Sequence, residues 1–278
     1  MKHVLITGGP SNEYIDEVMK ITNMSTGSLA VMLAQMFANN KYQVSLILTK
    51  TIKTPYVDDV AAMPNVNLVR FETTDELLRA IDAVVSIAQP DIIIHSAAVA
   101  DYKPEFSFRM EDMARELAEN IINELQFLRP ENITESQLAK DILEVLTNPN
   151  CKVNDETKIS SMEPNLTVKL GLTPKIISHL RGMCPDAYIA GFKLLENVTE
   201  GELVDAAMKQ LEKCNTDIVF ANDLAELRRG HTERLVVTPQ GYNGIKVDGA
   251  YGIYNLIKMV TEAEDEETEE TEDNEEQA

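Results

Sequence analysis

The first ten residues read MKHVLITGGP, and residues 91–96 read DIIIHS. The first stretch predicts a strand over residues 2–7, because it is apolar and β-branched until a Gly-Gly-Pro turn breaks it. The second stretch is a near-continuous apolar run, which is typical of a strand buried on both faces of a parallel sheet. Both stretches therefore predict central strands of an α/β fold.

Helical and β patterns alternate along much of the remaining chain. Apolar residues at helical spacing predict helices, and short β-branched runs predict strands. The predicted helices cover residues 27–40, 75–88, 174–181, 200–215 and 250–261, and the predicted strands cover residues 42–49, 67–71, 166–170, 187–193 and 217–221, with a hairpin at 234–247. This order predicts a Rossmann-like three-layer fold with a mainly parallel sheet and helices on both faces.

Two segments depart from this alternation. Residues 105–157 contain two amphipathic helical patterns, at 109–127 and 135–147, which we interpret as a helical insertion within a single domain at residues 1–261. Residues 262–278 hold eleven acidic residues and no Lys or Arg. This segment therefore supplies about half of the formal net charge of −21. Because these charges repel one another and the segment has no apolar face, it is predicted to be a disordered acidic tail.

Composition excludes several classes of protein. A net acidic chain lacks the clustered Lys and Arg of non-specific nucleic-acid binding, but this does not exclude a local anion site. The cysteines Cys151, Cys184 and Cys214 are far apart and form no CxxC motif, so we expect no disulfide framework or zinc site. The sequence shows no signal-peptide core and no apolar run of membrane-spanning length. We therefore expect a cytoplasmic protein with no nucleic-acid or membrane partner.

Six polar motifs follow predicted strands or lie in loops at one expected edge of the sheet. They are TGGPSN at residues 7–12, ITNMSTGS at 21–28, HSAAVADY at 95–102, TKISS at 157–161, AGFKLL at 190–195 and DIVFANDL at 217–224. Nucleotides bind beyond the carboxyl ends of the strands in such folds. The motifs therefore predict a nucleotide site more strongly together than any one of them does alone.

The first two motifs predict an anion site. Gly8 and Gly9 let backbone N–H groups approach an anion, and Ser25, Thr26 and Gly27 come directly before a helix whose N-terminus favours phosphate or carboxylate. The alternatives are an ordinary tight turn for the glycines and simple N-capping by one of the hydroxyls.

The motif after the buried strand combines small side chains with one charge. Ala97 and its small neighbours leave room for a flat ligand, and Asp101 is the charged residue among them. The alternative is a tightly packed strand end. We interpret His95 as a core or turn histidine rather than a catalytic base.

The remaining motifs also have two interpretations each. Lys158 could close over phosphates as a point charge or could be a solvated surface lysine. Phe192 could stack on a base or belong to the core. Asn222 and Asp223 could contact a base or ribose, or could form an Asx turn.

Taken in order, these motifs resemble those of the phosphopantothenate–cysteine ligase family, in particular its monofunctional bacterial form. The resemblance covers residues 2–258 and implies a homodimeric enzyme of coenzyme A biosynthesis. It implies that the 4′-phosphopantothenate carboxylate attacks the α-phosphate of CTP, or of ATP, with Mg²⁺ accompanying the triphosphate. Pyrophosphate then leaves, and the amine of L-cysteine attacks the acyl-nucleotidylate and releases CMP or AMP.

The resemblance also implies roles for individual residues. Asn23 would contact the acyl intermediate, and Lys158 would stabilise the phosphoryl-transfer transition state. The residues implied to bind the nucleotide are Gly8, Gly9, Ser25, Thr26, Gly27, Ala97, Asp101, Phe192, Asn222 and Asp223. No protein ligand for a metal is implied, because the nucleotide itself would hold most of the Mg²⁺ coordination.

Two other functions stay open at this point. The family usually carries Arg four residues before the motif asparagine, and Met19 takes that place here. This departure motivates a catalytically inactive relative that binds nucleotide or phosphopantothenate as a regulator or scaffold. The first strand with its TGG also suggests an NAD-dependent reductase, but GxGxxG is missing and the second strand ends in Thr49-Lys50 instead of an acidic residue.

Overall fold

The computed structural model describes the backbone of residues 1–52, 56–127, 134–153, 158–160, 162 and 164–276, without the side chains of residues 126–127 and 264–276. The chain divides into two compact units. The first comprises residues 1–11, 23–99 and 174–278, and the second comprises residues 12–22 and 100–173.

The first unit is built on an eight-stranded sheet. Its strands are β1 (His3–Gly8), β4 (Gln43–Thr49), β5 (Val66–Phe71), β6 (Ile92–His95), β9 (Tyr188–Leu195), β10 (Ile218–Asp223), β11 (Glu233–Val237) and β12 (Lys246–Asp248). They lie in the order β12-β11-β10-β9-β6-β1-β4-β5, and the six from β10 to β5 are parallel. Because β11 and β12 add antiparallel pairs at one edge, the sheet is mainly parallel, as the sequence predicts.

The order of the strands reverses at β1. The chain moves from β1 outward to β4 and β5, and then returns to the other side of β1 to form β6, β9 and β10. All six residues of β1 are buried between these neighbours. A reversal of this kind opens a crevice beyond the carboxyl ends of the two central strands. The segments that follow β1 and β6 are therefore the first place to look for a ligand site.

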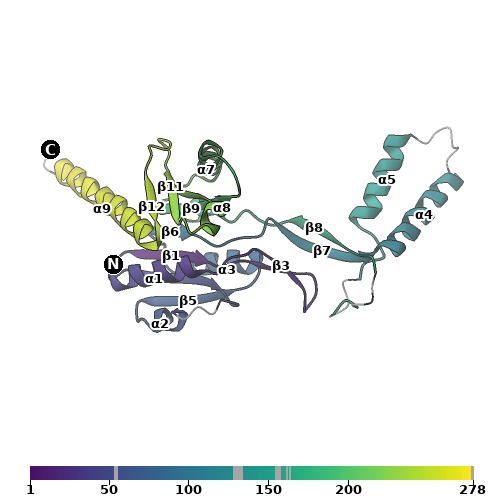
Figure 1. The fold of residues 1–278 in the computed structure, drawn as a ribbon, viewed down its shortest axis with the longest axis horizontal. Coiled ribbons are helices and arrows are strands. Elements are labelled where there is room, and N and C mark those ends of the chain that lie inside the picture. The colour runs from purple at the N-terminus through teal and green to yellow at the C-terminus, as the bar shows by residue number, and fades with distance from the viewer. Residues whose placement is uncertain (53–55, 128–133, 154–157, 161, 163, 277–278) are drawn as a thin grey trace. The chain divides into compact units, whose positions relative to one another are not determined.

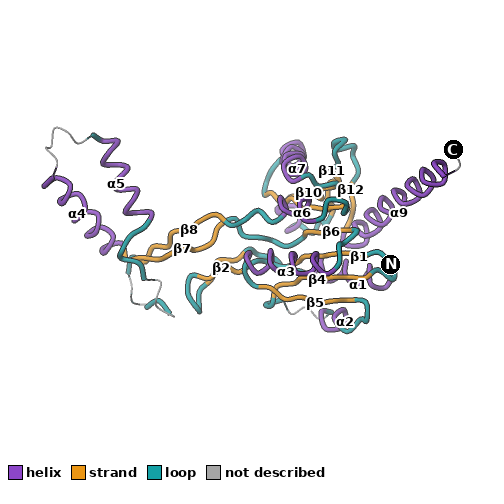
Figure 2. The backbone as a smooth tube through the Cα atoms, turned by 180° about the vertical axis from the view of Figure 1, so that it is seen from behind, coloured by secondary structure: helices purple, strands orange, loops and turns teal. Residues whose placement is uncertain are grey.

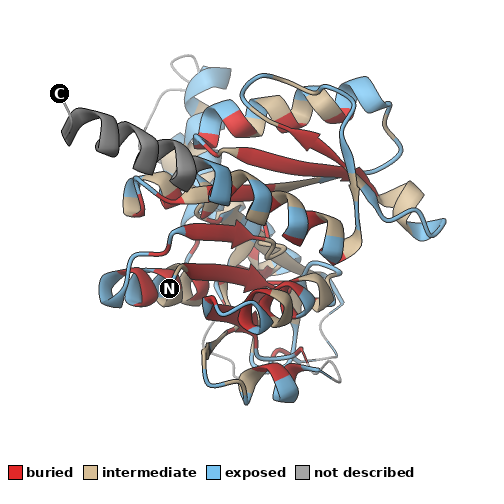
Figure 3. Ribbon diagram, turned by 90° about the vertical axis from the view of Figure 1, so that its left-hand side faces the viewer, coloured by how far each residue is buried: buried red, intermediate tan, exposed pale blue. Residues whose placement is uncertain are grey.

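Helices cover both faces of this sheet (Figure 1). The first face carries α1 (Ser28–Asn39), α2 (Val57–Ala61) and α9 (Gly249–Glu276), the second face carries α3 (Thr74–Ile87), α6 (Ile177–Met183) and α7 (Glu200–Cys214), and α8 (Leu224–Arg228) follows β10. On the first face, Phe37 is fully buried with its ring edge-on to Tyr42 and Tyr254, at centroid distances of 5.1 and 4.9 Å. Figure 3 shows the strands buried between helices whose outer sides are exposed. The predicted three-layer α/β fold is confirmed.

In its described residues, the second unit contains two pairs of antiparallel strands and a pair of helices (Figure 2). Strands β2 (Asn12–Tyr14) and β3 (Lys20–Thr22) pair antiparallel, and so do β7 (Tyr102–Arg109) and β8 (Leu166–Leu172). The helices are α4 (Met110–Phe127) and α5 (Glu135–Thr147). A small core formed by Phe106, Phe108 and Met113 joins α4 to β7.

The predicted helices at 109–127 and 135–147 are confirmed as α4 and α5. Residues 105–157 also contain most of β7, a strand that the sequence did not predict. Pro104 and a β-bulge between Pro104 and Phe106 interrupt the alternation that would have marked this strand. The single domain at residues 1–261 stays a prediction.

The last helix also differs from its predicted end at Thr261, since α9 continues to Glu276. The physical reason is that glutamate is a good helix former and that no glycine or proline follows Gly252 to stop the helix. Residues 262–278 are predicted to be disordered. The side chains of residues 264–276, and residues 277–278 altogether, lie outside the described part of the chain. Neither α9 nor any other helix in the described ranges is long and apolar enough to cross a membrane.

Candidate functional site

Three glycines pack closely where β1 ends and α1 begins. A Cβ on Gly8 would lie 2.2 Å from the Cβ of Ala30 in α1, so only glycine fits between this strand and this helix. Gly9 and Gly27 both have positive φ angles, of 84° and 65°. A Cβ on Gly27 would lie 3.4 Å from the Cα of Gly9, so two motifs that are separate in the sequence meet here.

The N-terminus of α1 is suited to an anion. Gly27 is its N-cap, and no side chain caps the helix. Thr26 Oγ1 instead accepts hydrogen bonds from the N–H group of Ser28 at 3.4 Å and from its hydroxyl at 3.0 Å. The alternative interpretation of Ser25 or Thr26 as a simple N-cap is therefore wrong. The first-turn N–H groups and the positive end of the helix dipole favour a phosphate at this place.

A buried pair of side chains joins β1 to β6 at the same edge. Thr7 Oγ1 lies 2.8 Å from His95 Nδ1 and accepts a hydrogen bond from the N–H group of Ala97 at 3.3 Å. Burial lowers the pKa of His95 to about 4, so its ring is neutral near pH 7. The interpretation of His95 as a core histidine is confirmed. Through Thr7, the pair fixes the backbone of Ala97 beside the end of β1.

Asn23 is held against the segment that follows β6. Its Nδ2 donates hydrogen bonds to the carbonyl oxygens of Ala98 and Val99, at 3.2 and 3.1 Å. Ala98 in turn donates its N–H group to the carbonyl oxygen of Gly9 at 2.9 Å. These contacts place Asn23 beside the end of β1, at the point where the strand order reverses.

Strands β9 and β10 carry three further predicted residues, Phe192 within β9 and Asn222 and Asp223 at the end of β10. Phe192 packs against the core of the first face. Asp223 caps α8 and accepts hydrogen bonds from the N–H groups of Val198 at 2.8 Å and Ala225 at 2.6 Å, and these donors, Val198 first, hold its pKa below the ordinary value. Asn222 is buried, and its side chain has no hydrogen-bond partner among the described residues. Asn222 is therefore the polar group of this pair that is available to a ligand.

Two predicted residues belong to the second unit. Lys158 is exposed and has no ion-pair or hydrogen-bond partner in the described part of the chain, and Asp101 is exposed directly before β7. Met19, which replaces the arginine of the family pattern, lies exposed in the turn between β2 and β3. Thr157 and Ser161, which also belong to the lysine motif, lie outside the described residues.

The structure thus groups five predicted residues around the ends of β1 and β6 and places three more on β9 and β10. The first group is Gly8, Gly9, Asn23, Gly27 and Ala97, and the second is Phe192, Asn222 and Asp223. Sequence reasoning missed Thr7, whose position next to two glycines was the available signal, and it missed Asp16, which forms three backbone hydrogen bonds.

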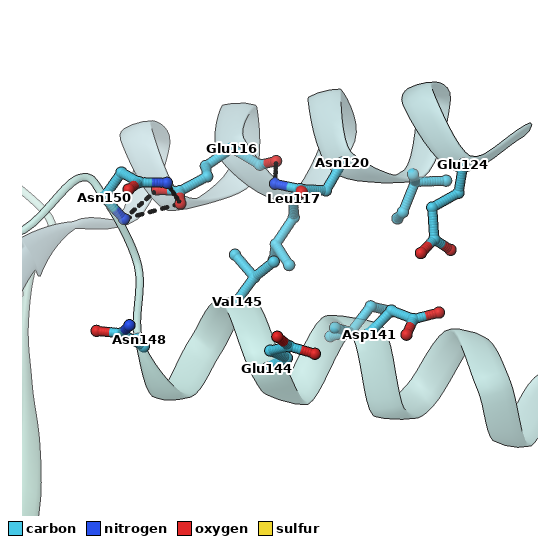
Figure 4. Close-up of a pocket in the computed structure, with 11 residues that line it drawn as sticks. Glu116, Leu117, Asn120, Glu124, Asp141, Glu144, Val145, Asn148 and Asn150 are labelled. Carbon is cyan, nitrogen blue, oxygen red and sulfur yellow. Dashed lines mark hydrogen bonds between the residues drawn. The ribbon is translucent and has the colours of Figure 1, made fainter. Parts of the chain in front are cut away.

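A cavity of about 310 Å³ lies between α4 and α5 in the second unit (Figure 4). Four of its lining side chains are acidic, namely Glu116, Glu124, Asp141 and Glu144. Burial and then Asp141 raise the pKa of Glu124. Because phosphates are anions, such a lining disfavours a nucleotide. Across the described residues, no group of three or more His, Cys, Asp or Glu side chains is arranged to hold a metal ion.

Known proteins are similar to this chain in sequence and in fold. The chain is 28% identical over 236 residues to the coenzyme A biosynthesis bifunctional protein CoaBC of Thermococcus kodakarensis, a match that covers 85% of this chain and 45% of that relative. The chain therefore spans less than half the length of this curated relative. The crystal structure of the DNA/pantothenate metabolism flavoprotein from Streptococcus pneumoniae is 29% identical, with a TM-score of 0.68 over 95% of this chain and 99% of that one.

A structure of Cab2 in complex with phosphopantothenate-cysteine shares the fold, with a TM-score of 0.61, 17% identity and coverage of 96% of this chain and 87% of that one. The family model for the DNA/pantothenate metabolism flavoprotein C-terminal domain matches residues 1–141 of the 278. The chain therefore belongs to the DNA/pantothenate metabolism flavoprotein C-terminal domain family.

Proposed function

We propose that this protein is a phosphopantothenate–cysteine ligase, which joins 4′-phosphopantothenate to L-cysteine at the expense of a nucleoside triphosphate. The observation that carries the proposal is the meeting of Asn23, Gly9 and Gly27 at the β1–β6 reversal, next to the uncapped N-terminus of α1. The similar protein of T. kodakarensis is named for coenzyme A biosynthesis, which favours an active ligase over a non-catalytic relative.

The first step of the proposed reaction is attack of the phosphopantothenate carboxylate on the α-phosphorus. An O–P bond forms, the bond to pyrophosphate breaks, and an acyl-nucleotidylate results. This chemistry needs positioning and charge stabilisation rather than a protein nucleophile. The N–H groups at the start of α1 would hold phosphate oxygens, and Lys158 would offset the negative charge that builds up in the transition state.

The second step is attack of the neutral amine of cysteine on the acyl carbon. The amide bond forms, the C–O bond to the nucleotide breaks, and the nucleoside monophosphate leaves while the amine loses its proton. Asn23 would contact the acyl group with its side-chain amide. None of the protein's own thiols is poised as a nucleophile, because burial raises the pKa of Cys151 to about 11 and also raises those of Cys184 and Cys214.

Three finer parts of the proposal concern the co-substrate and the assembly. We propose CTP as the nucleotide, with ATP as the alternative, and Mg²⁺ bound as its complex with the triphosphate, since Mg²⁺ prefers phosphate and water oxygens. Ala97, Phe192 and Asn222 would line the nucleotide site. A homodimer is the proposed assembly, and sedimentation equilibrium tests it.

Pyrophosphate release by the purified chain tests the activity. Reactions contain 4′-phosphopantothenate, L-cysteine and Mg²⁺ with either CTP or ATP, and each component is omitted in turn. We expect release that needs every component and is faster with CTP. The product of the full reaction should have the mass of phosphopantothenoyl-cysteine.

Two substitutions connect this activity to the site. Asn23→Ala and Lys158→Ala should each lower the rate by at least about 100-fold, which is the typical loss when one group that stabilises the transition state is removed. Asn120→Ala is the matched control, because Asn120 lines the acidic cavity between α4 and α5, which is not part of the proposed site, and it should leave the rate unchanged. Nucleotide and phosphopantothenate binding without any turnover would contradict the proposed function.

A further inference from the structure

We propose that Asp16 is a positioning residue for Lys158. This inference rests on the proposed function and extends it, because Asp16 would act through Lys158 rather than on the substrates themselves. Its basis is a set of hydrogen bonds within the second unit that join the turn between β2 and β3 to the residue next to Lys158.

One carboxylate oxygen of Asp16 closes the turn. Asp16 Oδ1 accepts hydrogen bonds from the N–H groups of Val18 at 2.7 Å and Met19 at 2.6 Å. The carbonyl oxygen of Met19 accepts the N–H group of Ile15 at 2.9 Å, so the turn is fixed at its other end as well. This local arrangement is an Asx-type turn, which asparagine can form as well as aspartate.

The other oxygen reaches a segment that is 143 residues away in the sequence. Asp16 Oδ2 accepts the N–H group of Ile159 at 3.0 Å. Ile159 is only 4% exposed, so the residue that donates this hydrogen bond is also buried. Lys158 is the preceding residue, and its own side chain is exposed. The carboxylate therefore fixes the backbone from which Lys158 projects.

Asp16 holds the backbone next to Lys158 through hydrogen bonds rather than through an ion pair with the lysine. The N–H groups of Met19 and Ile159 hold the pKa of Asp16 below its ordinary value, so the carboxylate is ionised near pH 7. Its oxygens are occupied by backbone donors, and Lys158 forms no ion pair within the described residues. The three backbone N–H groups occupy the Asp16 carboxylate, so within the described residues the Lys158 side chain is not held in a hydrogen-bonded ion pair with it.

Asp16→Asn separates the two functions of this carboxylate. The amide oxygen of the substituted side chain would still accept the N–H groups of the turn, but its NH₂ group cannot accept the N–H group of Ile159. Glu17→Gln is the matched control, because Glu17 is the exposed neighbour and loses the same charge. Hydrogen exchange at the Ile159 amide should become faster in Asp16→Asn and should be unchanged in Glu17→Gln.

A double-mutant cycle with Lys158→Ala tests whether Asp16 acts through the lysine. We expect Asp16→Asn to lower kcat by at least about tenfold with little change in KM, because a misplaced catalytic group can cost on the order of 100-fold. In the Lys158→Ala background the same substitution should have almost no effect on kcat. Equal losses in both backgrounds, or an unchanged kcat in the wild-type background, would overturn the inference.

The outcome also separates this inference from the proposed function. An inactive wild-type chain would refute the ligase proposal and, with it, the positioning role. Faster exchange at Ile159 in Asp16→Asn would then still establish the contact, while unchanged exchange in an active enzyme would overturn the inference alone.

Discussion

His95 makes the stability of the first unit depend on pH in a way that a single substitution removes. Burial lowers the pKa of this ring from 6.5 to about 4. Between these two values the unfolded chain binds a proton that the folded chain does not bind, so the free energy of unfolding falls as the pH falls. The contribution is fully present above pH 6.5 and decreases by about 1.4 kcal/mol per pH unit below it. Between about pH 7.5 and about pH 5, His95 therefore lowers the free energy of unfolding by about 2 kcal/mol.

His95→Asn is the variant that isolates this effect. Its amide can occupy the place of Nδ1 and keep the hydrogen bond to Thr7, but it does not titrate. Urea unfolding of both proteins at the two pH values, followed by far-UV circular dichroism because the chain has no Trp, gives the four free energies. Contributions from the carboxylates are common to both proteins and cancel in the comparison.

We expect the wild type to lose about 2 kcal/mol more than His95→Asn between the two pH values. Equal losses in the two proteins would show that His95 titrates in the folded state as it does in water. That result would refute the argument that a buried neutral ring links β1 to β6.

Three further substitutions test the packing of the first unit and the role of Gly27. Phe37→Ala should lower the free energy of unfolding by about 3–5 kcal/mol in urea titrations, because a fully buried ring leaves a cavity. Arg181→Ala should lower the free energy of unfolding by about 1–3 kcal/mol in the same titrations, because Arg181 donates hydrogen bonds to Asp217 and to the carbonyl oxygen of Ala187, both at 2.7 Å. A loss no larger than that of an exposed lysine replaced by alanine would contradict this. Gly27→Ala places a residue with a Cβ at a positive φ angle, which should lower the free energy of unfolding by about 1–2 kcal/mol. It should also raise the KM for the nucleotide, and an unchanged KM would show that the N-terminus of α1 does not bind the nucleotide.

The central sheet could be predicted because its strands carry strong local signals. The apolar runs of β1 and β6 and the amphipathic patterns of α4 and α5 gave nearly the observed bounds. The strands β2 and β3 are too short to show a periodic pattern. Strand β7 pairs with β8 across a long insertion, so this pairing could not be found from local pattern either. The end of α9 was missed because nothing in its sequence stops a helix.

The candidate site was predictable where residue type and position agreed. The glycines near β1 and the motif asparagine, Asn23, were identified from their motifs, and the structure brings them together. The contacts of Thr7 with His95 and of Asp16 with Ile159 join residues far apart in the sequence. Such contacts depend on strand order and on the path of an insertion, which the sequence of each segment does not contain.

The transfer of carboxylate oxygen to the nucleotide tests the central claim most directly. Phosphopantothenate labelled with heavy oxygen in its carboxylate is incubated with the protein, L-cysteine, Mg²⁺ and CTP, and the products are analysed by mass spectrometry. An acyl-nucleotidylate leaves one carboxylate oxygen on the α-phosphorus, so we expect one heavy oxygen atom in CMP and none in pyrophosphate. Unlabelled CMP, or heavy oxygen in released orthophosphate, would contradict the proposed ligase reaction.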